Sequence, residues 1–326
     1  MSEKASAIDI FMRIRNPFLV RSHFSAGVRP LVCFAFVAAL LSSSSVARRW
    51  QIITWGPNTP EWNQLLHVSG MRLGCSDSPG SCMREAASVS HAGNEAKIFL
   101  AVPLKLETAQ YGRQYAELSR NPSPVVEIGV DDFAGQYVRL LATGSSEAAD
   151  ILNSLIEGVK SGDSKLKFGA TIYEDELPLP ALTDPELPAA IRAKFDLVHL
   201  YLHFRSNALH TSAYVVQAKR LFPNAGIILG IYAYDRISYI PCAKGPSRPC
   251  TKQEELNYFR EALDEDITLL KNGAVSGLEF YPGSFGYEDQ WSGWDKPNIC
   301  PGRKQECIEN TKALRQLVLD KFKSEL

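Results

Sequence analysis

The sequence of 326 residues lacks the marks of several common protein classes. Its formal net charge is only −1, which argues against a strongly basic nucleic-acid-binding protein, and we expect no nucleic-acid partner. No G-x-G-x-x-G follows a predicted strand and no Walker A motif occurs, and we expect no cofactor. The G-x-S-x-G and H-E-x-x-H motifs are also missing, which argues against an α/β-hydrolase nucleophile and a common zinc hydrolase.

The N-terminal apolar run, residues 31–41, is too short for a comfortable membrane span. Several arginines precede this run, and four serines and Ser45-Val46-Ala47 complete the pattern of a secretory signal peptide with its cleavage site. We therefore expect residues 1–47 to be a cleaved signal peptide, with an uncleaved N-terminal anchor as the alternative. The mature protein, residues 48–326, is then secreted, either extracellular or periplasmic, and does not contact the membrane.

The cysteines support export from the cytoplasm. Of the seven, Cys33 lies in the apolar run, and the other six form local pairs around loops rich in glycine, proline and serine. We predict three disulfides that close short loops in an oxidising compartment. Zinc is the rival interpretation, but zinc sites prefer shorter spacing between paired cysteines. The predicted pairs are Cys75–Cys82, Cys242–Cys250 and Cys300–Cys307.

Segments typical of strands alternate with segments typical of helices, which indicates parallel βαβ units. The strand-like segments are residues 50–56, 97–104, 125–133, 166–173, 195–204, 225–235 and 275–281. An eighth strand is expected near residues 70–74 or between residues 286 and 300. We predict an α/β fold, a single (β/α)8 TIM-type barrel of regular or irregular form. A doubly wound open sheet is the alternative.

Alternation along these strands predicts which side chains face the barrel interior. One set on each strand is uniformly apolar, for example Val126 and Ile128, and should face the helices. The other set is polar, whereas a purely structural barrel is filled by valine, isoleucine and leucine. We therefore predict a wet, ligand-binding interior in which glycines leave room. The predicted inward residues include Ile53, Trp55, Glu127, Gly129, Asp131, Gly169, Thr171, Tyr173, His199, Tyr201, His203, Arg205, Gly230, Tyr232, Tyr234, Gly277, Glu279 and Tyr281.

Acidic residues stand at the ends of several strands. Glu279 lies near the end of the last strand, and Glu174 directly follows the strand 166–173. Two carboxylates across a cleft can hydrolyse a glycosidic bond. Over about residues 50–290 the layout resembles that of secreted (β/α)8-barrel glycoside hydrolases. In their large retaining group the acid/base follows the fourth strand and the nucleophile ends the seventh. The resemblance implies that Glu279 is the nucleophile and Glu174 the acid/base.

The sequence departs from that group at one position, because Tyr173 stands where the group usually has asparagine. This departure favours a non-catalytic carbohydrate-binding barrel as the alternative. Asp175 and Glu176 are equally placed acid candidates, and strand parity favours Asp175. The adjacent Asp131 and Asp132 form another acid pair, in which one pKa can rise and create a general acid.

Further alternatives concern the role of single residues. Glu279 is a structural lumen acid if it pairs with Arg205. His199 and His203 lack metal-ligand spacing and are expected to form hydrogen bonds in the lumen. A metal-assisted hydrolase is a third hypothesis, and its ligands would be Asp131, Asp132, His203 and Asp235.

Aromatic residues at strand ends offer an apolar face and a polar tip, which suits stacking on sugar rings. We therefore expect a carbohydrate substrate or ligand as the partner. The sequence does not specify the sugar or the oligomeric state. The residues predicted to bind substrate are Asp132, Tyr173, His199, Tyr201, His203, Arg205, Tyr232, Tyr234, Asp235, Tyr281 and Trp291.

Overall fold

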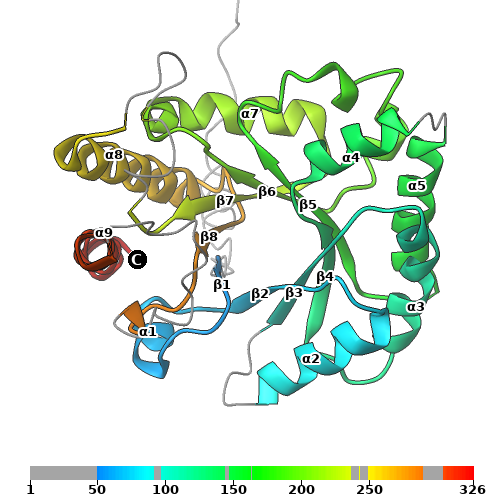
Figure 1. The fold of residues 1–326 in the computed structure, drawn as a ribbon, viewed down its shortest axis with the longest axis horizontal. Coiled ribbons are helices and arrows are strands. Elements are labelled where there is room, and N and C mark those ends of the chain that lie inside the picture. Colours follow the sequence, from blue (N-terminus) through cyan, green and yellow to red (C-terminus); the bar gives the residue numbers. More distant parts are fainter. Residues whose placement is uncertain are drawn as a thin grey trace, which may run out of the picture. The chain divides into compact units, whose positions relative to one another are not determined.

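Eight parallel strands pair edge to edge and close into a barrel in the computed structural model of the chain (Figure 1). The barrel closes where the first strand pairs with the last. The structure describes residues 50–91, 97–143, 147–162, 164–235, 242, 249–288 and 304–326. The predicted (β/α)8 barrel is thereby confirmed. In chain order the strands are β1 Gln51–Trp55, β2 Gly70–Gly74, β3 Lys97–Val102, β4 Val125–Val130, β5 Lys167–Tyr173, β6 Leu197–Tyr201, β7 Gly226–Tyr232 and β8 Gly277–Tyr281.

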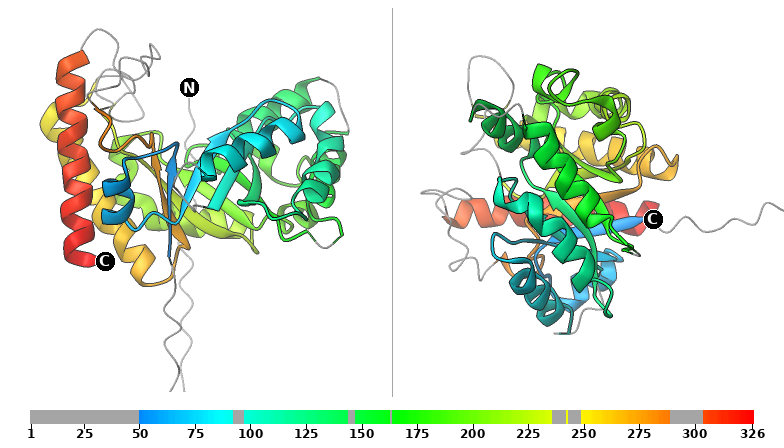
Figure 2. Two further views of the ribbon diagram at one scale, coloured as in Figure 1. Left: turned by 90° about the horizontal axis from the view of Figure 1, so that it is seen from below. Right: turned by 90° about the vertical axis from the view of Figure 1, so that its right-hand side faces the viewer.

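Helices follow the strands and surround the barrel (Figures 1 and 2). α8 shows how the sequence defines a helix end, because Thr251 and Glu254 form a reciprocal capping box at its start. Within the described residues, no helix has both the length and the apolar character needed to cross a membrane. The helices are α1 Pro60–Leu65, α2 Pro79–His91, η1 Glu107–Gln110, α3 Tyr111–Leu118, α4 Phe133–Ala142, α5 Ala148–Val159, η2 Pro180–Leu182, α6 Ala189–Arg192, η3 Arg205–His210, α7 Thr211–Leu221, α8 Lys252–Lys271 and α9 Lys304–Glu325.

The strand count corrects the strand positions of the two glutamates to which the resemblance assigned roles. β2 occupies one of the two places predicted for the eighth strand. Every later strand therefore moves up by one, so that Glu174 follows the fifth strand and Glu279 lies on the eighth. The expected positions after the fourth and seventh strands were wrong for both glutamates. β2 was hard to recognise because it is short, has glycine at both ends and carries Arg72 at its centre.

Two separate apolar layers match the predicted strand parity. The outward residues of the strands pack with the helices in one large cluster that includes Val198, Leu278 and Phe280. A small second cluster lies on the inward side of the strands and consists of Ile53, Phe99, Leu197 and Ile228. Val126 was predicted to face outward but packs against this lumen cluster. The pairing of β3 with β4 shifts register beside this residue, which interrupts the regular alternation.

The glycines of the lumen make room for side chains of the barrel itself. A Cβ atom at Gly129 or Gly169 would collide with the carboxylate of Glu127, and one at Gly230 would collide with the ring of Tyr201. The expectation that these glycines leave a wet cavity is therefore wrong for the middle of the lumen. The space that they vacate holds a glutamate and a tyrosine.

Two of the predicted disulfides are present. Cys75 is bonded to Cys82, and Cys242 is bonded to Cys250. The first joins the segment after β2 to α2, and all four cysteines are buried. The third predicted pair includes Cys300, which lies outside the described residues, as does the predicted signal peptide.

Candidate active site at the mouth of the barrel

Glu279 occupies the centre of a buried hydrogen-bond network inside the barrel. Its side chain is 0 % exposed. Oε1 accepts hydrogen bonds from Trp55 Nε1 at 2.8 Å and from the Tyr201 hydroxyl at 2.5 Å. Oε2 lies 2.6 Å from His199 Nδ1 and 3.5 Å from a terminal nitrogen of Arg72. Four donors from three strands, β1, β2 and β6, thus hold this carboxylate rigidly and leave it no exposed oxygen.

His199 bridges two carboxylates across the lumen. While its Nδ1 contacts Glu279, its Nε2 lies 3.1 Å and 3.2 Å from the two carboxylate oxygens of Glu127 on β4. Burial and Arg72 lower the pKa of His199, but the two glutamates outweigh them and raise it above its ordinary value. The imidazole is therefore held in its protonated form and donates to both carboxylates.

Glu279 is correspondingly held in its ionised form. Burial by itself raises the pKa of Glu279, but His199 and Arg72 more than offset this effect and lower the pKa to about 2. For Arg72, burial lowers the pKa, and the surrounding carboxylates of Glu279, Glu127 and Asp131 raise it above its ordinary value. The predicted partner Arg205 is replaced by Arg72, a residue of the strand that the sequence showed only weakly.

Arg72 connects this buried network to the mouth of the barrel. One terminal nitrogen donates to Thr171 Oγ1 at 2.8 Å, and the guanidinium lies 5.0 Å from the centre of the Trp55 ring. Thr171 in turn hydrogen-bonds Asp131, the first residue after β4. The Nε atom of Arg72 has no hydrogen-bond partner among the described residues. One buried donor of the lumen is therefore left for a water molecule.

Asp131 is a carboxyl group of the mouth that remains half-buried. Burial raises its pKa, Asp132 and Glu279 add to the shift, and Arg72 and Thr171 oppose it. The next residue, Asp132, has a left-handed backbone with φ of 44°, an uncommon conformation for a residue other than glycine. Strained residues of this kind cluster at functional sites. Asp131 therefore holds its proton more tightly than an ordinary aspartate does. The exposed Asp132 lies beside it.

Glu174, the predicted acid/base, is bound on all sides by backbone and amide donors. It is 2 % exposed. One oxygen accepts from His203 N at 2.7 Å, and the other accepts from Phe204 N at 3.2 Å and from Asn207 Nδ2 at 2.7 Å. These bonds fix the segment between β6 and η3. Both carboxylate oxygens of Glu174 are therefore occupied by donors of this segment.

Asp175 pairs with His203 at the same rim. Asp175 Oδ1 lies 2.8 Å from His203 Nδ1, and both side chains are about one-third exposed. One ligand atom each from Glu174, Asp175 and His203 lie within 4.8 Å of one another, so the three could approach one ion. Because these atoms already bond within the chain, we assign no metal there. Of the predicted metal set, this cluster contains His203 alone.

Glu176 is a second mouth carboxyl with a raised pKa. Burial raises its pKa to about 7, with contributions from the nearby Asp175 and Asp132, and a hydrogen bond from Tyr173 N opposes the shift. The carboxylate accepts that bond at 3.0 Å. Acids from the ends of β4 and β5 therefore lie near enough to influence one another's protonation.

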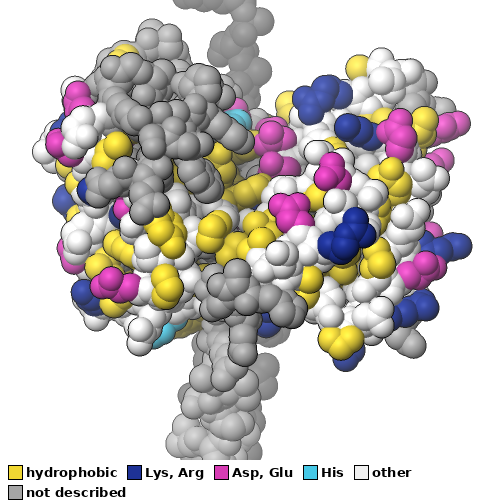
Figure 3. Space-filling model, turned by 60° about the horizontal axis from the view of Figure 1, so that its bottom comes forward, with side chains coloured by type: hydrophobic (Ala, Val, Ile, Leu, Met, Phe, Trp, Pro, Cys, Tyr) yellow, Lys and Arg dark blue, Asp and Glu magenta, His cyan; other side chains and the backbone are white. Residues whose placement is uncertain are grey.

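Aromatic rings form a continuous wall around this part of the barrel. On the face in Figure 3, hydrophobic side chains gather in the middle and acidic side chains lie beside them. Trp291, also predicted to bind substrate, lies outside the described residues. The ring pairs, with centroid distances, are Trp55–Tyr281 at 5.7 Å, Tyr232–Tyr281 at 5.8 Å, Tyr201–Tyr232 at 5.0 Å, Tyr173–Tyr201 at 6.3 Å, Tyr232–Tyr234 at 6.0 Å and Tyr173–His203 at 3.7 Å.

Two of the predicted site residues point elsewhere. Arg205 belongs to η3, because β6 ends at Tyr201, and its guanidinium binds Glu255 of α8 at 2.8 Å. Its predicted lumen position is therefore wrong. The carboxylate of Asp235 is bound by Asn310 of α9 at 3.0 Å. Asp235 thus contacts the outer helix layer.

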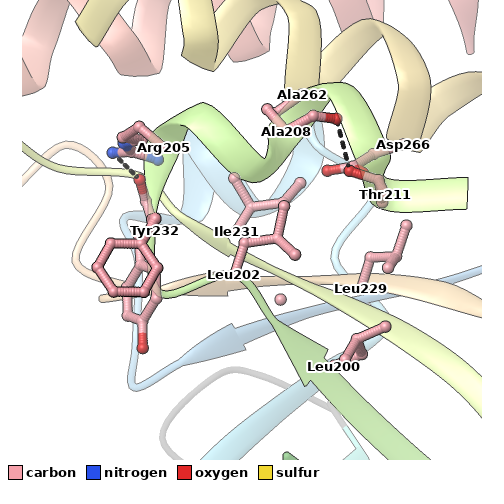
Figure 4. A pocket seen from close by; sticks show the side chains of 12 residues that line it. Leu200, Leu202, Arg205, Ala208, Thr211, Leu229, Ile231, Tyr232, Ala262 and Asp266 are labelled. Carbon is pink, nitrogen blue, oxygen red and sulfur yellow. Dashed lines mark hydrogen bonds between the residues drawn. The ribbon is translucent and has the colours of Figure 1, made fainter. Parts of the chain in front are cut away.

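A separate cavity lies behind the barrel wall, between β6 and β7 on one side and η3 and α8 on the other (Figure 4). Asp266 and Thr211 lie at one end and Arg205 and Tyr232 at the other. Burial raises the pKa of Asp266 well above its ordinary value, and its Oδ1 has no partner among the described residues. The strand side of this cavity includes the outward-facing Leu200, Leu229 and Ile231, so the cavity lies behind the barrel wall and not in the mouth.

Comparison with known proteins gives a likeness of fold. No family model and no curated protein matches the chain. A GH18 chitinase from Pseudoalteromonas aurantia matches with 13 % identity over 82 % of this chain and 99 % of that chain, at a TM-score of 0.45. A GH113 β-1,4-mannanase matches with 9 % identity over 82 % and 98 %, at a TM-score of 0.46. The barrel layout that the sequence predicts is present in the structure itself.

Sequence reasoning missed part of the site. Glu127 and Trp55 were placed in the lumen by strand parity but were not assigned to the site. Arg72 was not selected as a site residue at all, and Glu176 was named only as an acid candidate equally placed with Asp175. A signal was available for Glu127, since an acid within an apolar strand calls for a buried partner. The pairing of Arg72 with Glu279 joins residues that are far apart in sequence, and β1 brings the two strands together.

Proposed function

We propose that this protein is a secreted glycan-active hydrolase whose site is the mouth of the barrel, with Asp131 as the proton donor. The observation that carries the proposal is the place of Asp131, a half-buried carboxyl group beside the exposed Asp132 that Thr171 and Arg72 connect to the buried Glu279. The pKa of Asp131 is raised and that of Glu279 is lowered to about 2. Environments that push two carboxyl pKa values apart are typical of acid/base catalysis.

Asp131 has the properties that protonation of a glycosidic oxygen requires. It is half-buried, so a substrate in the mouth can reach it, and its raised pKa keeps a proton available. The carboxylates of the exposed Asp132 and the half-buried Asp175 lie at the same rim and are the candidates for activating water. Glu279 has a positioning role. It accepts hydrogen bonds from Tyr201 and Trp55, whose rings form part of the aromatic wall.

A carbohydrate-binding barrel without catalysis is the second candidate. The observation that favours it is the burial of Glu279 and Glu174, the pair implied by the resemblance. Both are at most 2 % exposed and have donors on both oxygens. Neither can attack an anomeric carbon in this arrangement. The aromatic wall would still bind a sugar.

Hydrolysis and binding of oligosaccharides by Asp131→Asn distinguish the two candidates. We expect the wild type to cleave at least one member of a panel of neutral and charged oligosaccharides. Asp131→Asn should lower kcat by about 10²–10⁴-fold and leave KM within about threefold. Asp264→Asn, on α8 in an ion pair with Lys321, is the matched control and should keep full activity.

The other outcomes are equally informative. Binding without any product in the wild type would replace the hydrolase by the binding barrel. Full activity of Asp131→Asn would remove Asp131 from the role of proton donor. If no oligosaccharide binds, the glycan-active function is wrong.

The proposal includes export. We propose that residues 1–47 are a signal peptide and that residues 48–326 are the mature domain. The disulfides Cys75–Cys82 and Cys242–Cys250 support it, because such bonds persist in oxidising compartments. Intact mass measurement of protein secreted from a eukaryotic or bacterial host tests it. A retained N-terminal segment would indicate the anchor instead.

A further inference from the structure

A face-to-face aromatic pair stands at the rim between β5 and β6. The rings of Tyr173 and His203 are 3.7 Å apart with an angle of 11° between their planes. Tyr173 is the last residue of β5, and His203 lies two residues beyond β6. Both are only half-buried. We call this pair the stacked platform, and its partly accessible rings suit contact with the apolar face of a sugar.

Each ring of the stacked platform carries an accessible carboxylate at its polar edge. The Tyr173 hydroxyl donates to Asp132 Oδ1 at 2.7 Å. On the other ring, His203 Nδ1 lies 2.8 Å from Asp175 Oδ1. Asp132 is exposed and the Asp175 side chain is 28 % exposed, so both retain oxygen surface for a ligand. The platform is thus an apolar surface between two acids.

The charge around the stacked platform has one sign. The segments after β4, β5 and β6 (residues 131–133, 174–179 and 202–204) contain five acids and no lysine or arginine. The nearby arginines, Arg72 and Arg205, are buried and bound to Glu279 and Glu255. These three described segments therefore carry acids but contain no arginine or lysine that could neutralise them.

We propose that the stacked platform is a subsite for a sugar unit that carries a protonated amino group, as in a glucosamine oligomer. The inference rests on the proposed glycan-active function. The apolar face of the sugar lies on the rings, and the ammonium group donates to Asp132 or Asp175. Uronic acids and sulfated sugars are repelled by the same carboxylates.

Binding of a matched set of oligosaccharides tests the assignment. The set has equal chain length and contains a glucosamine oligomer, its N-acetylated form, a neutral glucose oligomer and a uronic acid oligomer. Titrations are followed by calorimetry at mildly acidic pH, with the Asp131→Asn variant to prevent turnover. We expect the glucosamine oligomer to bind tightest and the uronic acid oligomer weakest. The preference should shrink as salt is raised, because these charges are accessible to solvent.

Charge-removing variants locate the effect. Asp132→Asn and Asp175→Asn should each weaken binding of the glucosamine oligomer about two- to fivefold, as for exposed ion pairs. Neither should change binding of the neutral oligomer by more than about twofold. Asp264→Asn is the matched control on the far helix layer and should change neither. Near-equal binding of the glucosamine oligomer and its N-acetylated form by the parent protein would overturn the inference.

Other results distinguish this inference from the function on which it rests. If neutral or acetylated sugars are bound or cleaved best and the two aspartates do not matter, the glycan function stands and the charged subsite is wrong. Tighter binding of a lysine-rich peptide than of the glucosamine oligomer would make the acids a peptide site. If no sugar binds, both proposals fail.

Discussion

His199 Nδ1 lies 2.6 Å from Glu279 Oε2, and both side chains are completely buried. The other ring nitrogen of His199 faces Glu127, and Arg72 approaches Glu279 from β2. Two carboxylates, one imidazolium and one guanidinium therefore fill the middle of the lumen with no net charge. Buried charges of this kind are tolerated only while each has its partner.

Removing the imidazolium should destabilise the barrel strongly. In His199→Gln, Glu127 and Glu279 share a single buried cation, Arg72. We expect the free energy of unfolding to fall by about 3–5 kcal/mol, the range for breaking a buried ion pair. Urea denaturation followed by tryptophan fluorescence measures it. Asp264→Asn breaks an exposed pair and should cost less than about 1 kcal/mol. A similar small loss in His199→Gln would show that the network is dispensable.

Glu176→Gln should change stability in a pH-dependent direction. Burial raises the pKa of Glu176 to about 7, so the folded protein holds this proton more tightly than the unfolded chain does. Stability is therefore lost as pH rises from the unfolded value of about 4.3 through about 7. Relative to the wild type, Glu176→Gln should gain stability near pH 8 and show little difference near pH 4. Melting temperatures of the variant and the wild type, measured between about pH 4 and pH 8, test this prediction. An equal difference between the two proteins at both ends of this range would contradict the raised pKa of Glu176.

Much of the barrel could be predicted from local patterns. Period-two alternation in β5, β6 and β8 predicted which residues face inward, and His199, Tyr201 and Glu279 do meet in the lumen. Such alternation is a property of each strand by itself. It identifies the face of a side chain without any knowledge of its neighbours.

The chemical partners could not be predicted in the same way. From the sequence, Glu279 was expected to pair with Arg205 or to be a nucleophile. In the structure its arginine partner is Arg72 of β2, the strand that pairs with β1. Glu174 appeared as a catalytic acid from its position after a strand. Its role is decided by backbone donors at His203 and Phe204, which come close only after folding. Register and strand ends, which set these contacts, are weakly encoded in sequence.

The end of β6 illustrates the same limit. The apolar and aromatic run 195–204 predicted a long strand, but β6 ends at Tyr201. Arg205 therefore leaves the lumen and starts η3, where it donates to the carbonyl groups of Tyr232 and Tyr234. A residue beyond the strand end no longer follows the alternation, so parity failed there.

The two described disulfides should contribute similar amounts of stability if restriction of the unfolded chain is their main effect. Their sequence separations are 7 and 8 residues, and the loop-entropy relation gives about 2.5 kcal/mol for each. We expect the double variants Cys75→Ala with Cys82→Ala and Cys242→Ala with Cys250→Ala to lose nearly equal free energy of unfolding in urea. Treatment of the wild type with dithiothreitol should cost at least the sum of the two losses, because the predicted Cys300–Cys307 bond is reduced as well. A much larger loss for the first variant would instead indicate that Cys82, which is 0 % exposed, packs α2 against the barrel.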